Sequence, residues 1–514
     1  MALIDFKFQA GIDKQNTSVG AENRWVDSDN VRFRYGLPEK VGGWASLVTD
    51  TIVGVARAQH AFVDLDGNRY VAIGTDKFLL IYFEGKLHDI TPLKTTLTSA
   101  TIATTNGSPT CTITKTAHGL SAGDIIQLDN VTLPGGTGFS NSDFEDKNFQ
   151  VITVPTTSTF TITQSSNATA TVSTGGSLSI KPFEPVGPRA QSYGYGWGID
   201  TWGTGNWGEA ASASDISLEP GLWSLSNFGE VLIATIGNGK TFTWNAGAGS
   251  PLTTRASTTT SNFQTNNNPT ATRITLTSPT TRHLIHLGTE TTIGNTSTQD
   301  DMFIRFSDRE AINIYTPTAT NTAGSQRLQD GTKIMSAIRS KENILVWTDN
   351  SLYLMKFVGA PFTFGFEQVG TNCGIIGKNA VIQIDGAAFW MSSKGFFLYD
   401  GTVKSLPCSV EDFVYDNFDT TKGQQVYAGL NNLYTEIVWY YPSNGSEYND
   451  KYVVYNYGEG TWYTGTEART TWIDATVYQN PFATKYDSNS SGTFPVIVGE
   501  SGLGQTTYFE HEVG

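Results

Sequence analysis

The sequence predicts an all-β chain: a β-propeller of six or seven blades with a small inserted β-sandwich or barrel domain. Three observations predict this fold. No stretch of the 514 residues sustains apolar side chains at helical spacing, and short β-rich runs alternate with turns rich in Gly, Asn and Asp. These runs also group into units of about 40 residues, as in propellers. Closing such units into a ring hides sheet edges that would otherwise aggregate.

The first such unit covers residues 52–92. It contains four short β-rich runs, and the turns between them include Asp-Gly and Glu-Gly pairs, where a hairpin needs positive φ. Comparable units follow along the rest of the chain, at residues 222–245, 283–329, 334–369, 380–406, 424–463 and 472–509. The last unit is one strand short. We expect residues 30–34, which alternate before the turn at Tyr35-Gly36, to supply the missing strand. One or two β-sandwiches with a long meander are the alternative fold.

Two segments interrupt the repeat. Residues 97–182 are rich in Thr and Ser and poor in charge, and this length suffices for a small β-sandwich or barrel. The chain is thus expected to comprise an N-terminal segment with the first blade (1–96), the inserted domain (97–182) and the remaining blades (183–514).

The second interruption, residues 191–208, alternates aromatic residues with Gly. Exposed aromatic side chains are strong interface anchors, so this loop is a candidate contact between subunits. An ordered loop packed within the chain is the alternative. The candidate contact residues are Tyr193, Tyr195, Trp197, Trp202 and Trp207.

The composition supports a large core. Apolar residues make up 38% of the chain and aromatic residues 12%, which excludes global disorder. The longest apolar run, residues 78–83, is far shorter than the roughly 20 residues that cross a bilayer. Three cysteines are too few for a disulfide framework, so we expect buried thiols at Cys111, Cys373 and Cys408.

No residue pattern indicates catalytic machinery, a metal or a cofactor. The chain lacks a Gly-x-Ser-x-Gly elbow, a phosphate loop and the Ser-x-Asp-x-Gly-x-x-Trp turns of sialidase-type propellers. Asp64-x-Asp66-Gly67-Asn68 resembles the start of a calcium loop, but Thr75 replaces the twelfth-position Glu, which favours a hairpin turn. His283 and His286 stand three apart in a strand-like run and would point to opposite faces. We therefore expect a protein that is not an enzyme.

Several strings resemble tail proteins of bacteriophages. The longest covers residues 25–44, WVDSDNVRFRYGLPEKVGGW. Shorter ones are DITP (89–92), NTAGS (321–325), DGAAFWM (385–391), GFFLYDG (395–401) and EIVWY (436–440). The family that they resemble is the tail nozzle, or tail hub, of short-tailed (podovirus-type) phages.

This resemblance implies a structural protein of the virion tail, made in the host cytoplasm. Members of the family are propellers that assemble as a hexameric ring below the portal and adaptor and continue the DNA channel. The implied partners are further copies of the chain, adaptor and other portal-proximal tail proteins, tail fibres or spikes, and DNA that passes without sequence-specific binding; no membrane is implied. The net charge of −15 fits, because a wall that grips DNA must instead offer Lys and Arg to the phosphates.

Residues of the longest string are candidates for strand closure or docking at the N-terminus. They are Trp25, Arg32, Phe33, Arg34 and Trp44. The alternative function, from a different class, is a carbohydrate-binding or glycan-hydrolysing propeller. In that case Trp197, Trp202 and Trp207 would stack on sugars, and a catalytic carboxylate pair would come from distant blades.

Overall fold

The chain, analysed as a computed structural model, separates into two compact units. The structure describes residues 8–17, 19–21, 23–42, 44–189, 219–249, 251–258, 268–478, 481–485 and 493–500. The first unit, here called the ring unit, comprises residues 1–89, 186–254 and 258–514. The second, the inserted unit, comprises residues 90–185 and 255–257.

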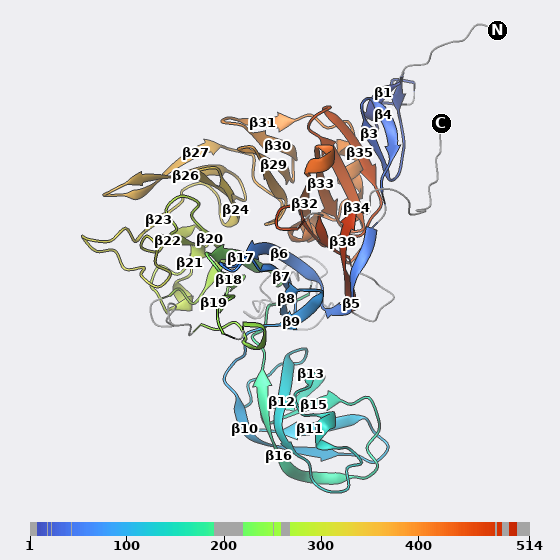
Figure 1. Cartoon of the computed structure of the whole chain (residues 1–514), viewed down its shortest axis with the longest axis vertical. Helices are drawn as coiled ribbons and strands as arrows, with labels where there is room; N and C mark the ends of the chain where they lie inside the picture. The colour runs from blue at the N-terminus through green and yellow to red at the C-terminus, as the bar shows by residue number, and fades with distance from the viewer. Residues whose placement is uncertain are drawn as a thin grey trace, which may run out of the picture. The chain divides into compact units, whose positions relative to one another are not determined.

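The ring unit is built from small antiparallel sheets that follow one another along the chain (Figure 1). In the described ranges, six of these sheets have four strands and one has three. The first three sheets are β6 (Ala56–Val63), β7 (Arg69–Thr75), β8 (Leu79–Phe83) and β9 (Lys86–Asp89); β17 (Trp223–Phe228), β18 (Val231–Ile236) and β19 (Thr241–Asn245); and β20 (Thr272–Thr277), β21 (Leu284–Thr289), β22 (Phe303–Phe306) and β23 (Gly324–Arg327).

The remaining four sheets complete the series. They are β24 (Ile334–Ser340), β25 (Asn343–Thr348), β26 (Leu352–Gly359) and β27 (Thr363–Gly370); β28 (Val381–Ile384), β29 (Ala387–Ser392), β30 (Gly395–Tyr399) and β31 (Val403–Leu406); β32 (Tyr427–Asn431), β33 (Glu436–Tyr441), β34 (Lys451–Asn456) and β35 (Thr461–Gly465); and β36 (Thr471–Ile473), β37 (Phe482–Thr484), β38 (Thr493–Glu500) and β5 (Trp44–Val53).

One strand of each sheet contributes to a closed inner ring. In order, β6, β17, β20, β24, β28, β32 and β36 each contact the next, and β36 contacts β6 again. The six four-stranded sheets are therefore blades of a β-propeller, and the three-stranded sheet occupies a further place between β6 and β20. The prediction of an all-β propeller is confirmed.

The N-terminal part of the chain completes the last blade, but not with the segment expected. β5 pairs antiparallel with β38, with Val53 opposite Thr493 and Trp44 opposite Glu500. Residues 31–34 form β3 (Val31–Arg34), which turns back onto β4 (Leu37–Lys40) instead. Tyr35 and Gly36 both have positive φ, of 53° and 77°, so they make a tight two-residue hairpin turn. This turn pairs β3 with β4, the segment that directly follows it.

Tryptophan side chains join neighbouring sheets. Trp223 of β17 donates its indole N–H to the carbonyl of Thr75 in the adjacent sheet, at 2.9 Å. A Cβ on Gly74 would lie 2.5 Å from Trp223 Cδ1, so only glycine leaves room for this ring. Trp472 of β36 makes the same kind of contact on β32, where a Cβ on Gly429 would lie 2.6 Å from its Cγ. These contacts fix the spacing between inner strands.

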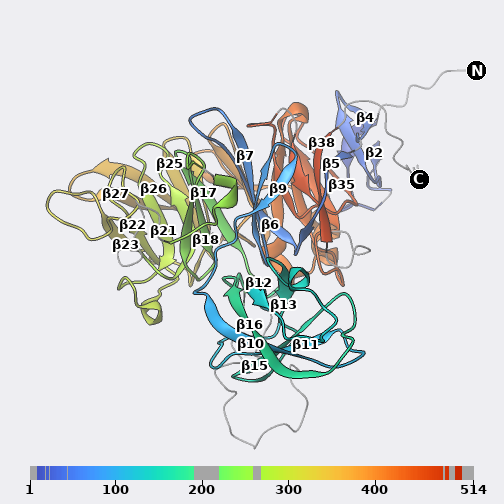
Figure 2. The same cartoon turned by 60° about the horizontal axis from the view of Figure 1, so that its bottom comes forward.

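The inserted unit is one seven-stranded sheet that curls around its own apolar core (Figure 2). Its strand order is β13-β12-β16-β10-β11-β15-β14, with β16 pairing on both sides. In β11 and β15 the Ile, Phe and Cys side chains face the core while Thr alternates outward, which accounts for the Thr-rich, charge-poor composition. The strands are β10 (Leu97–Thr104), β11 (Thr110–Thr114), β12 (Ile125–Thr132), β13 (Asn148–Gln150), β14 (Thr153–Thr156), β15 (Thr159–Thr163) and β16 (Val172–Pro182).

Helices are short throughout the described chain. The α-helix α1 covers Glu411–Asn417, and none of the described helices has the length and apolar character needed to span a membrane. The 3-10 turns are η1 (Asn141–Asp143), η3 (Pro251–Thr253), η4 (Thr296–Thr298), η5 (Thr420–Gln425) and η6 (Asn432–Tyr434). All three cysteines are buried and free.

Replacing Gly74 by Val tests the packing of the inner ring. The added side chain collides with the buried Trp223 ring, so we expect the free energy of unfolding to fall by about 1–3 kcal/mol. Thermal unfolding of the purified chain measures this loss. Gly249→Val is the matched control, since a Cβ there meets nothing within 4 Å; equal melting temperatures for the two variants would contradict the packing argument.

Candidate functional site: the N-terminal clamp and the axial cavity

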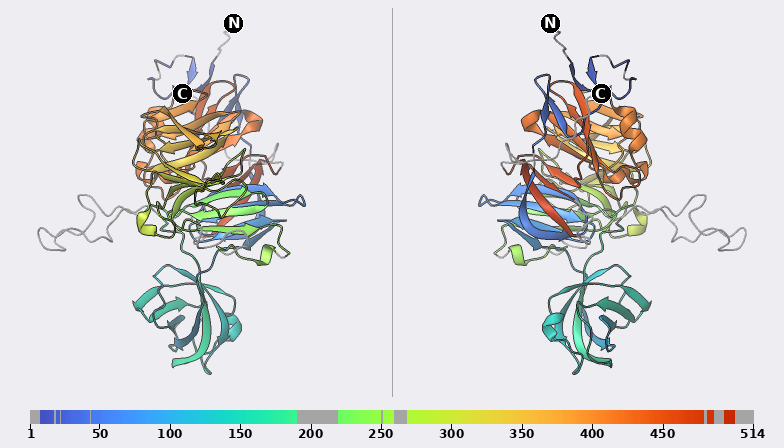
Figure 3. Two further views of the ribbon diagram at one scale, coloured as in Figure 1. Left: turned by 90° about the vertical axis from the view of Figure 1, so that its left-hand side faces the viewer. Right: turned by 90° about the vertical axis from the view of Figure 1, so that its right-hand side faces the viewer.

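Strands β1–β4 form a small assembly that docks on the ring, and we call residues 9–40 the N-terminal clamp. β1 (Gln9–Ile12) pairs parallel with β2 (Arg24–Trp25), and both β1 and β3 contact β35. Figure 3 shows the blue clamp strands beside the orange and red strands of the ring in both side views. The clamp therefore docks on the blade that precedes the one β5 completes.

A buried ion pair lies between the clamp and the ring. Arg32 Nε lies 2.9 Å from Glu436 Oε1, and both side chains are only 4% exposed. The guanidinium also stacks 3.4 Å above the ring centroid of Tyr434. The Tyr463 hydroxyl donates to the same carboxylate oxygen, Glu436 Oε1. Burial, together with the Glu436 charge, raises the pKa of Tyr463, which keeps this phenol protonated as a donor.

The other residues predicted for closure or docking occupy different positions. Trp25 and Phe33 belong to an aromatic series that ends on Tyr463, with ring centroids 6.3 Å and 6.1 Å apart. Arg34 is more exposed, and its guanidinium lies 5.3 Å from the Tyr434 ring centroid. Trp44 is not in the clamp but at the first position of β5, the closing strand.

The aromatic and glycine-rich loop is outside the described residues. Its candidate contacts Tyr193, Tyr195, Trp197, Trp202 and Trp207 all fall between residues 190 and 218, which the structure does not describe.

A cavity of about 200 Å³ lies where the inner strands converge, and we call it the axial cavity. Every sheet of the ring contributes to its wall through β6, β17, β20, β24, β28, β32 or β36, or through the residues directly before β28. Most of the lining residues that the structure describes are apolar, and none of these is Asp or Glu. A second cavity of about 200 Å³, the outer cavity, shares Ile274 and Lys378 with the first.

Three polar side chains of the axial cavity are distinctive. Lys378 donates from Nζ to the carbonyl of Trp223 at 2.6 Å, and Asn379 donates from Nδ2 to the carbonyl of Arg57 at 2.9 Å. Burial of the amine, with a smaller contribution from the Arg273 charge, lowers the pKa of Lys378 to about 7. Gln59 is 9% exposed, and neither its amide oxygen nor its amide nitrogen has a hydrogen-bond partner among the residues that the structure describes. Sequence reasoning missed all three, because nothing local shows that these segments converge.

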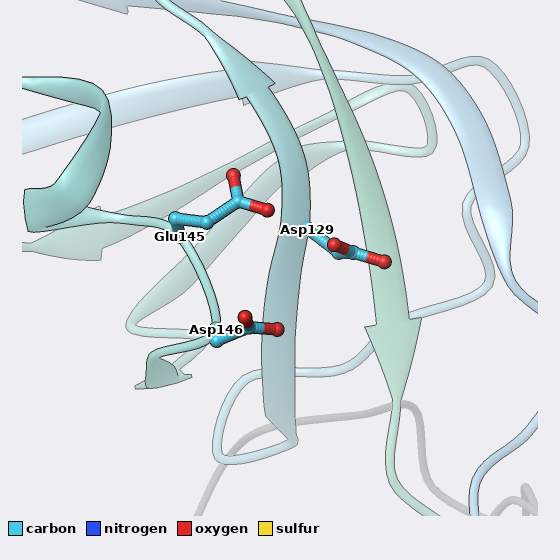
Figure 4. Close-up of side chains that lie close together, drawn as sticks. All are labelled: Asp129, Glu145 and Asp146. Atoms are coloured by element: carbon cyan, nitrogen blue, oxygen red, sulfur yellow. The ribbon is translucent and has the colours of Figure 1, made fainter.

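Three carboxylates gather in the inserted unit (Figure 4). Oxygens of Asp129, Glu145 and Asp146 lie within 4.8 Å of one another. Asp129 is already paired with Lys181, whose Nζ lies 2.5 Å away, and this contact lowers the Asp129 pKa. Glu145 accepts two successive backbone N–H groups of β12, at 2.9 and 2.7 Å. These bonds give the cluster a structural role in shaping the irregular part of β12, where Asn130 has positive φ.

The residues weighed as metal ligands serve the fold. Asp64 accepts from the backbone of Asp66 and Asn68 and so forms the predicted turn between β6 and β7. His286 is fully buried, with Nε2 2.9 Å from the Tyr315 hydroxyl and Nδ1 3.1 Å from Thr272 Oγ1. Burial lowers its pKa to about 3. His283 is also buried, and both ring nitrogens contact threonine hydroxyls.

Comparisons with known proteins give only distant structural matches. No family model and no curated protein matches the chain. Among solved structures, the computationally designed protein Ika8 is 9% identical with a TM-score of 0.37, covering 89% of this chain and 100% of its own. Phage phi92 endosialidase is 11% identical with a TM-score of 0.22, covering 94% of this chain and 74% of its own. The dihydro-heme d1 dehydrogenase NirN is 8% identical with a TM-score of 0.31, covering 76% and 58%.

Replacing Arg32 by Met tests the docking of the clamp. The variant leaves Glu436 buried without its cation, so we expect the free energy of unfolding to fall by about 3–5 kcal/mol. Urea unfolding monitored by tryptophan fluorescence measures it. Arg34→Met is the matched control and should change stability by less than about 0.5 kcal/mol, since Arg34 is 41% exposed. Equal urea midpoints for the two variants would contradict the role assigned to Arg32.

The buried histidine His286 predicts sensitivity to acid. Its pKa is about 3 in the folded chain, against about 6.5 in an unfolded one, so the unfolded state binds more protons between these values. Stability should therefore fall as the pH is lowered from 6.5 towards 3, with about 3 kcal/mol of the loss at pH 4 due to His286. Thermal unfolding of the wild type and His286→Gln across this range measures it. Parallel pH profiles for the two proteins would show that His286 is not responsible.

Proposed function

We propose that the chain is a structural protein of the tail of a short-tailed bacteriophage, acting in a nozzle or hub ring that continues the DNA channel. One observation carries the proposal. The longest string that resembles this family, residues 25–44, contains Arg32, which forms the buried ion pair between clamp and ring, and the first residue of the closing strand. A resemblance that includes residues holding the ring together suits a structural component.

The dimensions of the axial cavity bear on where DNA would pass in this proposal. A cavity of about 200 Å³ holds a small molecule, whereas the major groove of a duplex is by itself about 12 Å wide. The DNA channel of our proposal therefore runs between several copies of the chain, six in the family it resembles, and not along the axis of one propeller. A net charge of −15 per copy favours a wall that does not hold phosphates.

The bonding of the titratable side chains is consistent with a structural role. Glu436 is engaged by Arg32 and Tyr463, Asp64 by its hairpin turn, and His286 by two hydroxyl groups. Each of these groups stabilises a fold element, and no reacting arrangement is needed to account for its position.

Electron microscopy of phage particles that carry a tagged copy of the chain tests the proposal. We expect the tag at the tail, with a ring of copies around an opening wide enough for a duplex. A protein that is absent from particles, is monomeric at every concentration and binds glycans on an array would contradict it and favour the carbohydrate-binding alternative.

Combined Trp197→Ala and Trp202→Ala substitutions should weaken ring assembly and leave the melting temperature unchanged.

A further inference from the structure

We propose that the axial cavity is a binding site for a small organic monocarboxylate, held by the Lys378 ammonium group and the amides of Gln59 and Asn379. The proposal is independent of the tail function. It rests on the composition of the cavity wall, on the charge balance around Lys378 and on the unpartnered amide of Gln59.

The charges around Lys378 favour binding of an anion. Lys378 lines both cavities and donates to a neutral carbonyl, Trp223 O, at 2.6 Å. Glu219, the carboxylate among the described lining residues of the outer cavity, is already held by Arg273 at 2.6 Å and by Lys333 at 2.7 Å. Burial, and to a smaller extent Arg273, lowers the pKa of Lys378 to about 7, so this lysine is costly to keep charged without a carboxylate of its own among the described lining residues of the axial cavity. A bound anion supplies the missing negative charge.

The amides supply the remaining recognition. The Gln59 side chain is nine-tenths buried in the cavity wall, and its two polar atoms have no partner in the described part of the chain; a buried amide without partners is unfavourable. Its N–H₂ group is a donor suited to a carboxylate oxygen. Asn379 is anchored through the Arg57 carbonyl, which holds the polar groups of β6 and of the segment before β28 at the same part of the ring.

The rest of the wall selects the class of anion. Leu225, Ile274, Ile338, Val381 and Ile382 line the same cavity, together with two tryptophans. One cation with apolar surroundings suits a singly charged head with a short hydrocarbon tail. Inorganic phosphate carries more charge at neutral pH and has no apolar part, so its desolvation would be poorly compensated here.

Thermal shift and calorimetric titration of the full chain test the site. At constant ionic strength and pH, we expect butyrate to raise the melting temperature in a saturable way, and phosphate and chloride to raise it much less. Lys378→Met should weaken butyrate binding about ten- to hundredfold, since it removes a charge-assisted hydrogen bond. Lys356→Met is the control, because Lys356 is 46% exposed and pairs with Glu367 on β27.

A second variant covers the case in which Lys378→Met fails to fold. Gln59→Leu keeps the side-chain volume and removes the unpaired amide, so it should fold at least as stably as the wild type and bind butyrate several-fold more weakly. The proposal is overturned if butyrate acts no more strongly than chloride, if phosphate binds more tightly than butyrate, or if every folded variant responds like the wild type. None of these outcomes bears on assembly into a tail ring.

Discussion

Closure of the ring by strands from opposite ends of the chain is the constraint on which the rest of the structure depends. β5 pairs with β38 and so gives the last blade its fourth strand. Without it, β38 would present an open edge, the kind of edge that natural sheets cover. The contact of β36 with β6 brings the last blade against the first, and the inner strands can then converge on one axis.

The clamp and the closing strand are consecutive segments that bind two neighbouring blades. The chain first docks on one blade, where Arg32 meets Glu436 of β33 and Phe33 meets Tyr463 of β35, and then crosses to the neighbouring blade as β5. A buried ion pair adds little net stability compared with an apolar pair of the same size, yet each partner is costly to bury alone. A docking position in which Arg32 and Glu436 do not meet would leave a buried charge unpaired, which is energetically unfavourable. The ion pair therefore favours one register of the clamp on the ring, and β5 follows the clamp in the chain. Lys378 differs from this pair in one respect: no carboxylate stands beside it among the lining residues of the axial cavity that the structure describes.

The parts of the fold that depend on local sequence were predictable. Asp64 to Asn68 makes the expected hairpin turn, and the short Gly and Asn turns mark most of the blade strands. Within the unit predicted over residues 283–329, residues 311–315 belong to a loop, because the Asp308 carboxylate accepts hydrogen bonds from the backbone N–H groups of Arg309 and Thr322. The innermost strand of that blade is β20, which lies in a Thr-rich stretch before the predicted unit.

Features that depend on distant pairing were not predictable. Two N-terminal segments have sequences that suit a strand, residues 31–34 and 44–53. The hairpin at Tyr35 and Gly36 pairs the first segment with β4, so that the second pairs with β38. Arg32 carries no local sign that Glu436 is its partner, and the axial cavity exists only after seven sheets converge.

Hydrogen exchange of the full chain, resolved by peptide, tests ring closure most directly. The account predicts that backbone amides of residues 44–53 exchange as slowly as those of the inner strands and that residues 493–500 are protected together with them. Exchange of residues 44–53 at the rate of an unstructured chain, while the blades stay protected, would contradict closure by the N-terminal strand.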